Sequence, residues 1–161
     1  MEKALKEVLS SDILNKYQVH VRVIGRMSLL PSNLQELIKQ VENKTETYNQ
    51  FYLNIALAYG GRSEIVDATK KIASLVKLGE VNPEDISEDL IEKHLYTAHL
   101  PQPDPDLIIR TGSESRLSNF LLWQAAYSEL FIIDVYWPDF REIDLERAIR
   151  DYQKRKRRFG K

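Results

Sequence analysis

Two patterns of apolar and polar positions alternate along the chain. Short runs of β-branched and apolar residues predict strands, whereas apolar residues that recur every three or four positions predict amphipathic helices. The predicted strands are 19–24, 51–59, 107–110 and 130–136. The predicted helices are 2–15, a second opening at 31–32, a third capped by Ser63, a short helical region that begins at 82–83, and then 87–96, 119–127 and 144–158.

Helices and strands follow one another from end to end, and this order defines the expected fold. Strands separated by helices form parallel pairs through right-handed crossovers. We therefore predict an α/β fold with an open, mainly parallel sheet and helices on both faces. The 161 residues are enough for one domain with a real core, so 1–161 is expected to be a single domain. Ligands of such folds bind beyond the carboxyl ends of the strands.

Composition and charge narrow the functional classes. A formal net charge of -1 argues against a generally cationic nucleic-acid binder. The absence of cysteine excludes disulfides, thiolate metal sites and a cysteine nucleophile, and it fits a reducing compartment. The three histidines have no close metal-ligand spacing. Because no apolar run reaches membrane-spanning length and the first residues carry no signal-peptide pattern, a cytoplasmic location is expected.

The segment 110–119 is unusually polar and lies between a predicted strand and a predicted helix. Arg110 and Arg116 carry guanidinium groups, which suit phosphate oxygens in bidentate geometry. Gly112 allows a tight turn that brings backbone N–H groups near a ligand, and Ser118 adds a hydroxyl donor. The following helix would direct its N-terminal N–H groups toward the same place. The segment therefore predicts a phosphate or diphosphate site.

An ordinary structural role for the same arginines stays open on the residues alone. Arg110 and Arg116 could form ion pairs with Glu114 and Asp106, as polar loops at strand ends often do. The glycines match neither a Walker loop nor a dinucleotide fingerprint. The sequence therefore leaves the phosphate site and the ion pairs as alternatives.

Glu129 follows the predicted helix 119–127 and precedes an apolar strand. A single carboxylate in such a place is usually a solvated turn residue or a partner for a cation at a helix end. Beside a phosphate site, however, it would be a ligand for Mg²⁺, which commonly takes one or two carboxylates together with phosphate oxygens. A second ligand must then come from elsewhere.

Taken together, these segments resemble the cis-prenyltransferases, which include undecaprenyl and dehydrodolichyl diphosphate synthases. The resemblance is carried by the stretch from Asp104 to Gln124, DPDLIIRTGSESRLSNFLLWQ, and by the blocks at 127–130 and 137–140. Two further blocks match, LNIALAYGGRSEIV at 53–66 and RRFG at 157–160. The matches run in order from about Val19 to Gly160, and the long arginine motif is highly specific.

The resemblance implies a role for each site residue. Four residues would bind the diphosphate of isopentenyl diphosphate: Arg110, Arg116, Leu117 and Ser118. Glu129 would bind Mg²⁺. Arg158 and Gly160 would reach the active site of the partner subunit in a homodimer.

The implied activity is condensation of isopentenyl diphosphate with an allylic diphosphate to form a cis-polyprenyl diphosphate. The catalytic base is not identified. The lipid product would bring the enzyme into peripheral contact with a membrane, and no nucleic-acid partner is expected. The aspartate-rich magnesium motif of trans-prenyltransferases is absent, which separates the two classes of enzyme.

The chain departs from the family pattern at two places. Ser115 stands where some bacterial members have a histidine close to the metal, so no direct role is assigned to this residue. The family's first motif, Asp-Gly-Asn-x-Arg, is absent, and with it the principal aspartate. We therefore expect the chain to be a C-terminal part of a larger domain, lacking the N-terminal portion and inactive alone.

Two other functions stay open. Some eukaryotic cis-prenyltransferases contain a non-catalytic partner subunit, which would also lack the first motif, although this chain keeps Arg110, Arg116 and Glu129 together. The basic residues 154–158 could instead bind a membrane or a nucleic acid, although such runs are usually solvated helix ends.

Overall fold

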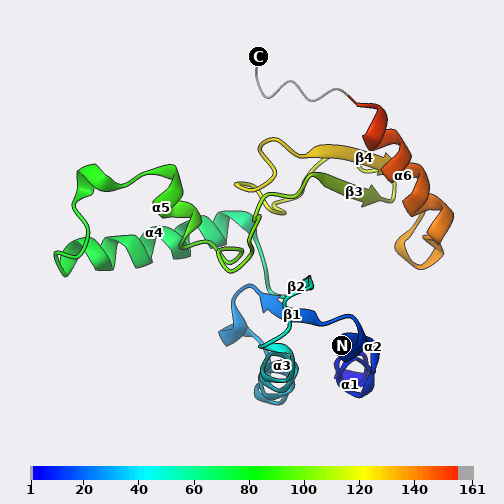
Figure 1. The fold of residues 1–161 in the computed structure, drawn as a ribbon. Coiled ribbons are helices and arrows are strands. Elements are labelled where there is room, and N and C mark those ends of the chain that lie inside the picture. The colour runs from blue at the N-terminus through cyan, green and yellow to red at the C-terminus, as the bar shows by residue number, and fades with distance from the viewer. Residues whose placement is uncertain (1, 156–161) are drawn as a thin grey trace. The chain divides into compact units, whose positions relative to one another are not determined.

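A computed structural model describes residues 2–155, with two compact units at 1–100 and 101–161 (Figure 1). The expected contacts of Arg158 and Gly160 lie outside the described residues. The single-domain organisation stays a prediction, and each unit is described by itself. None of the helices in residues 2–155 is long and apolar enough to cross a bilayer.

The first unit contains one parallel strand pair with helices between and around its strands. Its elements are α1 (Glu2–Ser10), α2 (Ile13–Lys16), β1 (Val19–Ile24), α3 (Ser32–Thr45), β2 (Phe51–Ala56), α4 (Gly61–Lys77) and α5 (Glu88–Glu92), with 3₁₀ turns at Met27–Leu29 and Pro83–Asp85. β1 and β2 pair in parallel from Val19 opposite Phe51 to Ile24 opposite Ala56.

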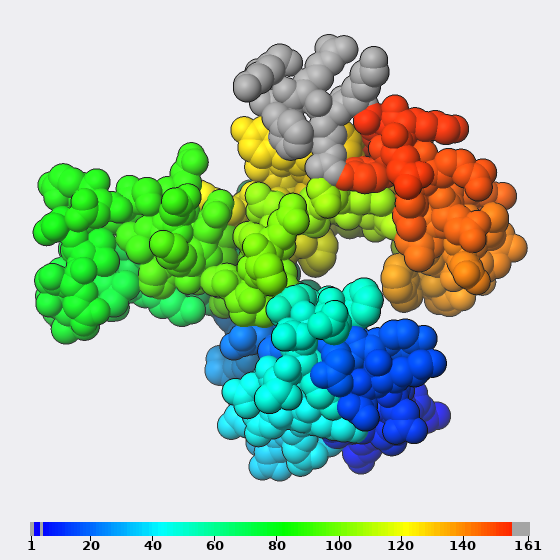
Figure 2. Space-filling view, in the orientation of Figure 1, coloured from blue at the N-terminus to red at the C-terminus, as the bar shows by residue number. Residues whose placement is uncertain are grey.

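The core of this unit lies between the first helices and β1. The buried side chains are Leu5, Leu14, Val21, Val23, Leu34, Ile38 and Val41. Three of them follow the helical spacing expected for α3, so burial of this stripe fixes the helix against β1. The buried Thr45 hydroxyl accepts the Val21 N–H at 3.1 Å. In the space-filling view, the blue atoms of α1 and the blue-to-cyan atoms of α3 pack into one continuous block (Figure 2).

Gly25 ends β1 at a close approach between two backbones. Its φ is +130°, and a Cβ there would overlap the carbonyl oxygen of Leu57. Glycine alone accommodates both this dihedral angle and this contact. The ends of β1 and β2 therefore lie against each other without a side chain between them.

The second unit contains β3 (Leu107–Thr111), β4 (Glu129–Ile133), a 3₁₀ turn at Trp137–Asp139 and α6 (Glu142–Lys154). β3 and β4 pair in parallel from Leu107 opposite Glu129 to Thr111 opposite Ile133. α6 packs beside β4 (Figure 1). Its first turn is closed by the buried carboxylate of Asp144, which accepts the Arg141 N–H at 3.1 Å.

The α/β class with parallel strands is confirmed, and β1 has the predicted bounds. The strands of the described residues form two parallel pairs, one within each unit. β2 ends earlier than predicted, at Ala56, because Ala58 adopts a positive φ of 46° and turns the chain. The predicted helix 2–15 is divided into α1 and α2.

Three other helix predictions need correction. Ser63 does not cap α4: the helix begins at Gly61, and the extended Gly60 accepts the first helical N–H, that of Glu64, at 2.9 Å. α5 ends at Glu92, short of the predicted 96. Residues 119–127 form turns instead of a helix. Asn119 and Leu121 have φ values of 67° and 44°, and left-handed residues break a right-handed helix.

Candidate functional site

A small cavity lies beside β3 in the second unit, and it is called the Arg110 crevice below. Its volume is about 100 Å³. Its apolar walls come from the paired strands and from Leu117 and Phe120, and its polar groups belong to residues 110 and 114–116. The structure therefore brings together Arg110, Arg116 and Leu117, three of the four predicted substrate-binding residues. Ser118 is not among the residues that line the crevice.

Arg110 is the side chain whose polar groups are least satisfied in this crevice. It occupies the penultimate position of β3, opposite Ile132 in β4. Its Nε is buried and has no hydrogen-bond partner among residues 2–155. A buried donor without an acceptor is costly, by about 1–3 kcal/mol or more for a charged group. An oxygen atom of a bound anion would supply the acceptor, so the geometry suits a phosphate ligand.

Arg116 is held differently, by an ion pair with Glu114. The distance from its Nη1 to the Glu114 Oε2 is 2.7 Å, and the two side chains are 67% and 47% exposed. The ion-pair alternative drawn from the sequence is therefore confirmed for Arg116, whereas Arg110 makes no ion pair within the described residues. Exposed pairs contribute little stability, so an anion could replace Glu114 at low cost.

The turn after β3 uses its backbone donors within the protein. Gly112 has a φ of +87°, as the predicted tight turn requires. Its N–H, however, donates to the carbonyl oxygens of Ile133 at 3.1 Å and Val135 at 3.0 Å. The Ser113 hydroxyl donates to the Asp134 carboxylate. The Gly112 N–H therefore does not face a ligand, contrary to expectation. Together with the Ser113 hydroxyl, it attaches the turn to the end of β4.

The expected helix terminus is also missing from the crevice. Residues 119–127 are turns, and Ser118 itself has a φ of 49°. Without a helix, no row of N-terminal N–H groups and no aligned peptide dipoles act on a ligand. The cationic side chains that line this crevice are those of Arg110 and Arg116.

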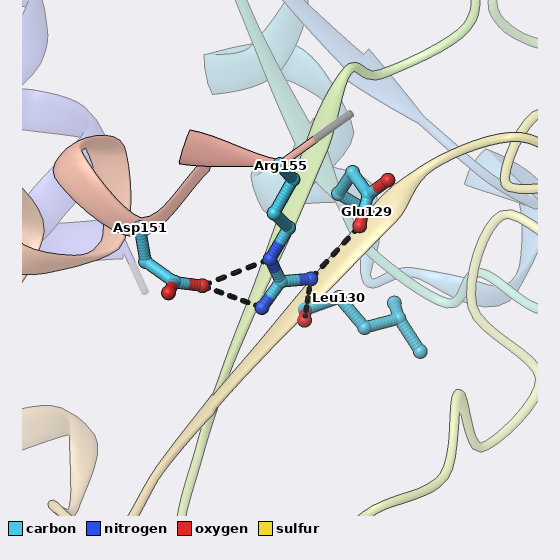
Figure 3. A network of polar contacts seen from close by, with 4 residues as sticks. All are labelled: Glu129, Leu130, Asp151 and Arg155. Carbon is cyan, nitrogen blue, oxygen red and sulfur yellow. Dashed lines mark hydrogen bonds and ion pairs between the residues drawn. The ribbon is translucent and has the colours of Figure 1, made fainter. Parts of the chain in front are cut away.

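Glu129 lies at the other end of the strand pair from the arginine. Parallel pairing places it opposite Leu107, three positions before Arg110, which corresponds to about 10 Å along the strands. Its Oε2 is 2.8 Å from the Nη1 of Arg155 (Figure 3). Glu129 is thus the partner of a cation beyond the end of α6, which was the structural alternative drawn from the sequence.

Arg155 joins three acceptors and was not singled out by the sequence. Besides Glu129, its guanidinium donates to the Leu130 carbonyl at 2.9 Å and to Asp151 at 2.9 and 2.5 Å (Figure 3). These bonds, first the one with Glu129 and then the one with Asp151, raise the pKa of Arg155 above its ordinary value. The basic run 154–158 was the only signal for it, and that run does not show which arginine turns back toward β4.

A complete magnesium site is not formed by the described residues. Within residues 2–155, no group of three histidine, aspartate or glutamate side chains is arranged to hold a metal ion. Glu129 also has its carboxylate engaged by Arg155. The role of Glu129 as a metal ligand stays a prediction, and it requires a second ligand besides Glu129.

Comparisons with known proteins agree on one family. Residues 1–160 match the family model described as "Putative undecaprenyl diphosphate synthase". The chain is 59% identical over 160 residues to the tritrans,polycis-undecaprenyl-diphosphate synthase (geranylgeranyl-diphosphate specific) of Methanocaldococcus jannaschii, and 52% identical over 160 residues to that of Pyrococcus furiosus. These matches cover 99% of this chain but 57% and 60% of the two relatives. The chain thus spans about three fifths of their length.

Solved structures give the same answer. Lavandulyl diphosphate synthase from Lavandula x intermedia, in complex with dimethylallyl diphosphate, matches with a TM-score of 0.93 and 38% identity. A "probable undecaprenyl diphosphate synthase" from Campylobacter jejuni matches with a TM-score of 0.83 and 33% identity. The matches cover 99% of this chain, and 70% and 71% of those chains.

Proposed function

Because the chain belongs to the cis-prenyltransferase family of undecaprenyl diphosphate synthases, we propose that it supplies the isopentenyl diphosphate site of a cis-polyprenyl diphosphate synthase. The single observation that carries this proposal is the buried Nε of Arg110, which lacks an acceptor within the described residues. We extend to this chain the allylic substrate in the relatives' names, geranylgeranyl diphosphate.

In the proposed reaction, the π-electrons of isopentenyl diphosphate attack the first carbon of the allylic diphosphate. A carbon–carbon bond forms, the allylic diphosphate leaves with its electron pair, and a proton is lost to give a cis double bond. Arg110 and Arg116 bind the diphosphate of isopentenyl diphosphate, which remains on the product. Their role is to hold this substrate in position, and correct positioning of two reactants is itself a large part of catalysis.

The two arginines would act in different ways on that diphosphate. Arg110 offers a buried donor in a small cavity with apolar walls, where a charge-assisted hydrogen bond is strong. Arg116 would exchange Glu114 for a phosphate oxygen, while Leu117 and the strand side chains exclude water. In this proposal Ser118 binds the diphosphate and Glu129 binds Mg²⁺. Both roles require these two residues to approach the crevice when the diphosphate is bound.

The proposed assembly is a homodimer. Arg158 and Gly160, which lie outside the described residues, would each contact the active site of the second copy. The proposed location is the cytoplasm, with the lipid product at a membrane surface.

A chimera tests the proposed activity directly. This chain would replace the matching 160 residues of the Methanocaldococcus relative, to which it is 59% identical. Radiolabelled isopentenyl diphosphate and geranylgeranyl diphosphate should then give a long cis-prenyl product in the presence of Mg²⁺. A folded chimera without product would contradict the enzymatic proposal.

The same chimera separates an enzyme from a non-catalytic partner subunit. A folded but inactive chimera that raises the activity of a catalytic subunit when the two are mixed would favour the partner role. Activity of the chimera by itself, lost on substitution of Arg110, would favour the enzyme.

A further inference from the structure

A second and larger cavity lies in the first unit, and it is called the basic cavity below. Its volume is about 410 Å³, within the range of small-molecule sites. It is lined by the end of β1, by Lys71 of α4 and by residues that follow α5. None of these residues lines the Arg110 crevice.

Three cationic side chains face the basic cavity: Arg22 from β1, Lys71 from α4 and Lys93 from the residue after α5. No aspartate or glutamate of the described chain lines it. None of the three makes an ion pair with another of the described residues 2–155. Like charges around one hollow repel one another, and a bound anion would relieve that repulsion.

The walls of the cavity are cross-linked by buried and half-buried polar groups. Asp67 of α4 accepts two hydrogen bonds from Arg26, both at 2.8 Å, and one from the Tyr96 hydroxyl at 2.5 Å. The buried Glu64 carboxylate accepts the Tyr96 N–H at 2.7 Å. The segment after α5 is thus attached to α4 and to the turn after β1. A cavity with fixed walls loses less entropy when it binds a ligand.

The same contacts engage the Asp67 carboxylate within the wall of the cavity. Hydrogen bonds from Arg26 and then Tyr96 lower the pKa of Asp67 to about 2, so it stays ionised and neutralises Arg26. Burial and the bond to Asp67 raise the pKa of Tyr96 to about 12, which keeps its hydroxyl protonated. The net positive charge of the cavity therefore rests with Arg22, Lys71 and Lys93.

His99 lines the basic cavity and provides a way to observe it. One of its ring nitrogens, Nε2, lies 2.8 Å from the Asn54 Oδ1. Burial and then the positive charge of Arg22 lower the pKa of the imidazole below its ordinary value. A negative charge placed in the cavity would raise that pKa again.

We propose that the basic cavity binds a small phosphate-bearing anion of the size of inorganic diphosphate. The guanidinium of Arg22 can hold two phosphate oxygens at once, and the two lysines add point charges from the other elements. A cation set drawn from three separate elements around one hollow favours a compact polyanion over an extended surface. This site is independent of the proposed catalytic function, since it shares no residue with the Arg110 crevice.

Titration of the 161-residue chain with inorganic diphosphate, followed by ¹⁵N NMR, tests the proposal. The amide signals of Gly25, Tyr96 and His99 should shift together in the wild-type protein, and the imidazole pKa of His99 should rise. R22A and K93A should each weaken this binding about tenfold, as expected for loss of one charge-assisted contact. Both side chains are exposed, so the far-ultraviolet circular dichroism should stay unchanged.

Two controls make the result decisive. K77A removes an exposed lysine of α4, the helix that contributes Lys71. Lys77 does not line the cavity, so this variant should leave the affinity for diphosphate unchanged. R110A should leave the shifts of Gly25 and Tyr96 intact, which separates this site from the catalytic crevice.

Three results would overturn the proposal. The first is the absence of shifts at millimolar diphosphate. The second is equal weakening by K77A and R22A, which would mean attraction by general surface charge. The third is binding to phosphatidylglycerol vesicles that depends on Arg22 while free diphosphate leaves the spectrum unchanged, which would mean a lipid surface.

Discussion

The Arg110 crevice and the basic cavity are both cationic, but they are built in opposite ways. The crevice comes from one continuous stretch around β3 and β4, and it is small, with a buried donor that lacks an acceptor within the described chain. The basic cavity takes its cations from positions 22, 71 and 93, and it is wider. A site formed by one segment leaves a motif in the sequence, whereas a site assembled from distant segments leaves none.

The largest expected effect follows from removing the buried donor of the crevice. In the chimera, R110A should lower kcat/KM for isopentenyl diphosphate about 100-fold, because one buried charge-assisted contact accounts for roughly 3 kcal/mol. R110K keeps the charge but loses the fork, and it should recover only part of the activity. Steady-state kinetics with both variants would measure the difference, and unchanged kinetics for R110A would remove the crevice from the mechanism.

A smaller effect is expected at the exposed arginine of the same crevice. R116A should lower kcat/KM for isopentenyl diphosphate about tenfold. The effect is smaller because the Arg116 side chain is exposed, and water weakens its interaction with the diphosphate. E114Q should leave activity unchanged or slightly higher, because it frees Arg116 from its ion pair. A strong loss of activity in E114Q would show that Glu114 has a direct role of its own.

The wall of the basic cavity should contribute to the stability of the fold. D67N should lower the free energy of unfolding by about 1 kcal/mol, as expected for weakened charge-assisted hydrogen bonds. The pKa of Asp67 is depressed to about 2, so its stabilising effect is complete above about pH 4 and is lost as the pH falls toward 2. Urea unfolding at pH 7 and pH 2.5 should therefore show a difference between D67N and wild type that shrinks at the lower pH.

The smallest effect is expected at the pair formed by Glu129 and Arg155. If Glu129 binds Mg²⁺, R155A in the chimera should lower the half-saturating Mg²⁺ concentration about two- to threefold, because the carboxylate no longer has a competing cation. The measurement is a Mg²⁺ titration of product formation, with K154A as the matched control at the end of α6. An unchanged titration curve would leave Glu129 with a structural role only.

Much of the fold was predictable because it depends on local pattern. β1 has the predicted bounds, since a β-branched run ends at a glycine whose backbone must approach Leu57. The helix predicted at 119–127 failed because its apolar spacing carries no information about φ. Asn119 and Leu121 take left-handed values, which the spacing of apolar residues does not predict.

The candidate site was predicted in part, for a related reason. Arg110, Arg116 and Leu117 are close in sequence and meet at one crevice. Glu129 is also close in sequence, yet the chain must return to the start of the next parallel strand, so it comes to lie opposite Leu107. The basic cavity could not be predicted, because its three cations are isolated positions in unrelated elements.

Gly25 and Gly112 show how differently two glycines can limit variation in this chain. At Gly112 a Cβ would meet nothing nearer than the Tyr136 ring at 4.0 Å, so only the dihedral angle restricts the residue. Asparagine and aspartate visit positive φ more readily than other residues and should survive there in a saturation library. At Gly25 the obstacle is the backbone of Leu57, which no change of neighbouring side chain can move away. Single substitutions at position 112 can therefore alter the turn beside the crevice. At position 25, on the rim of the basic cavity, no residue other than glycine fits.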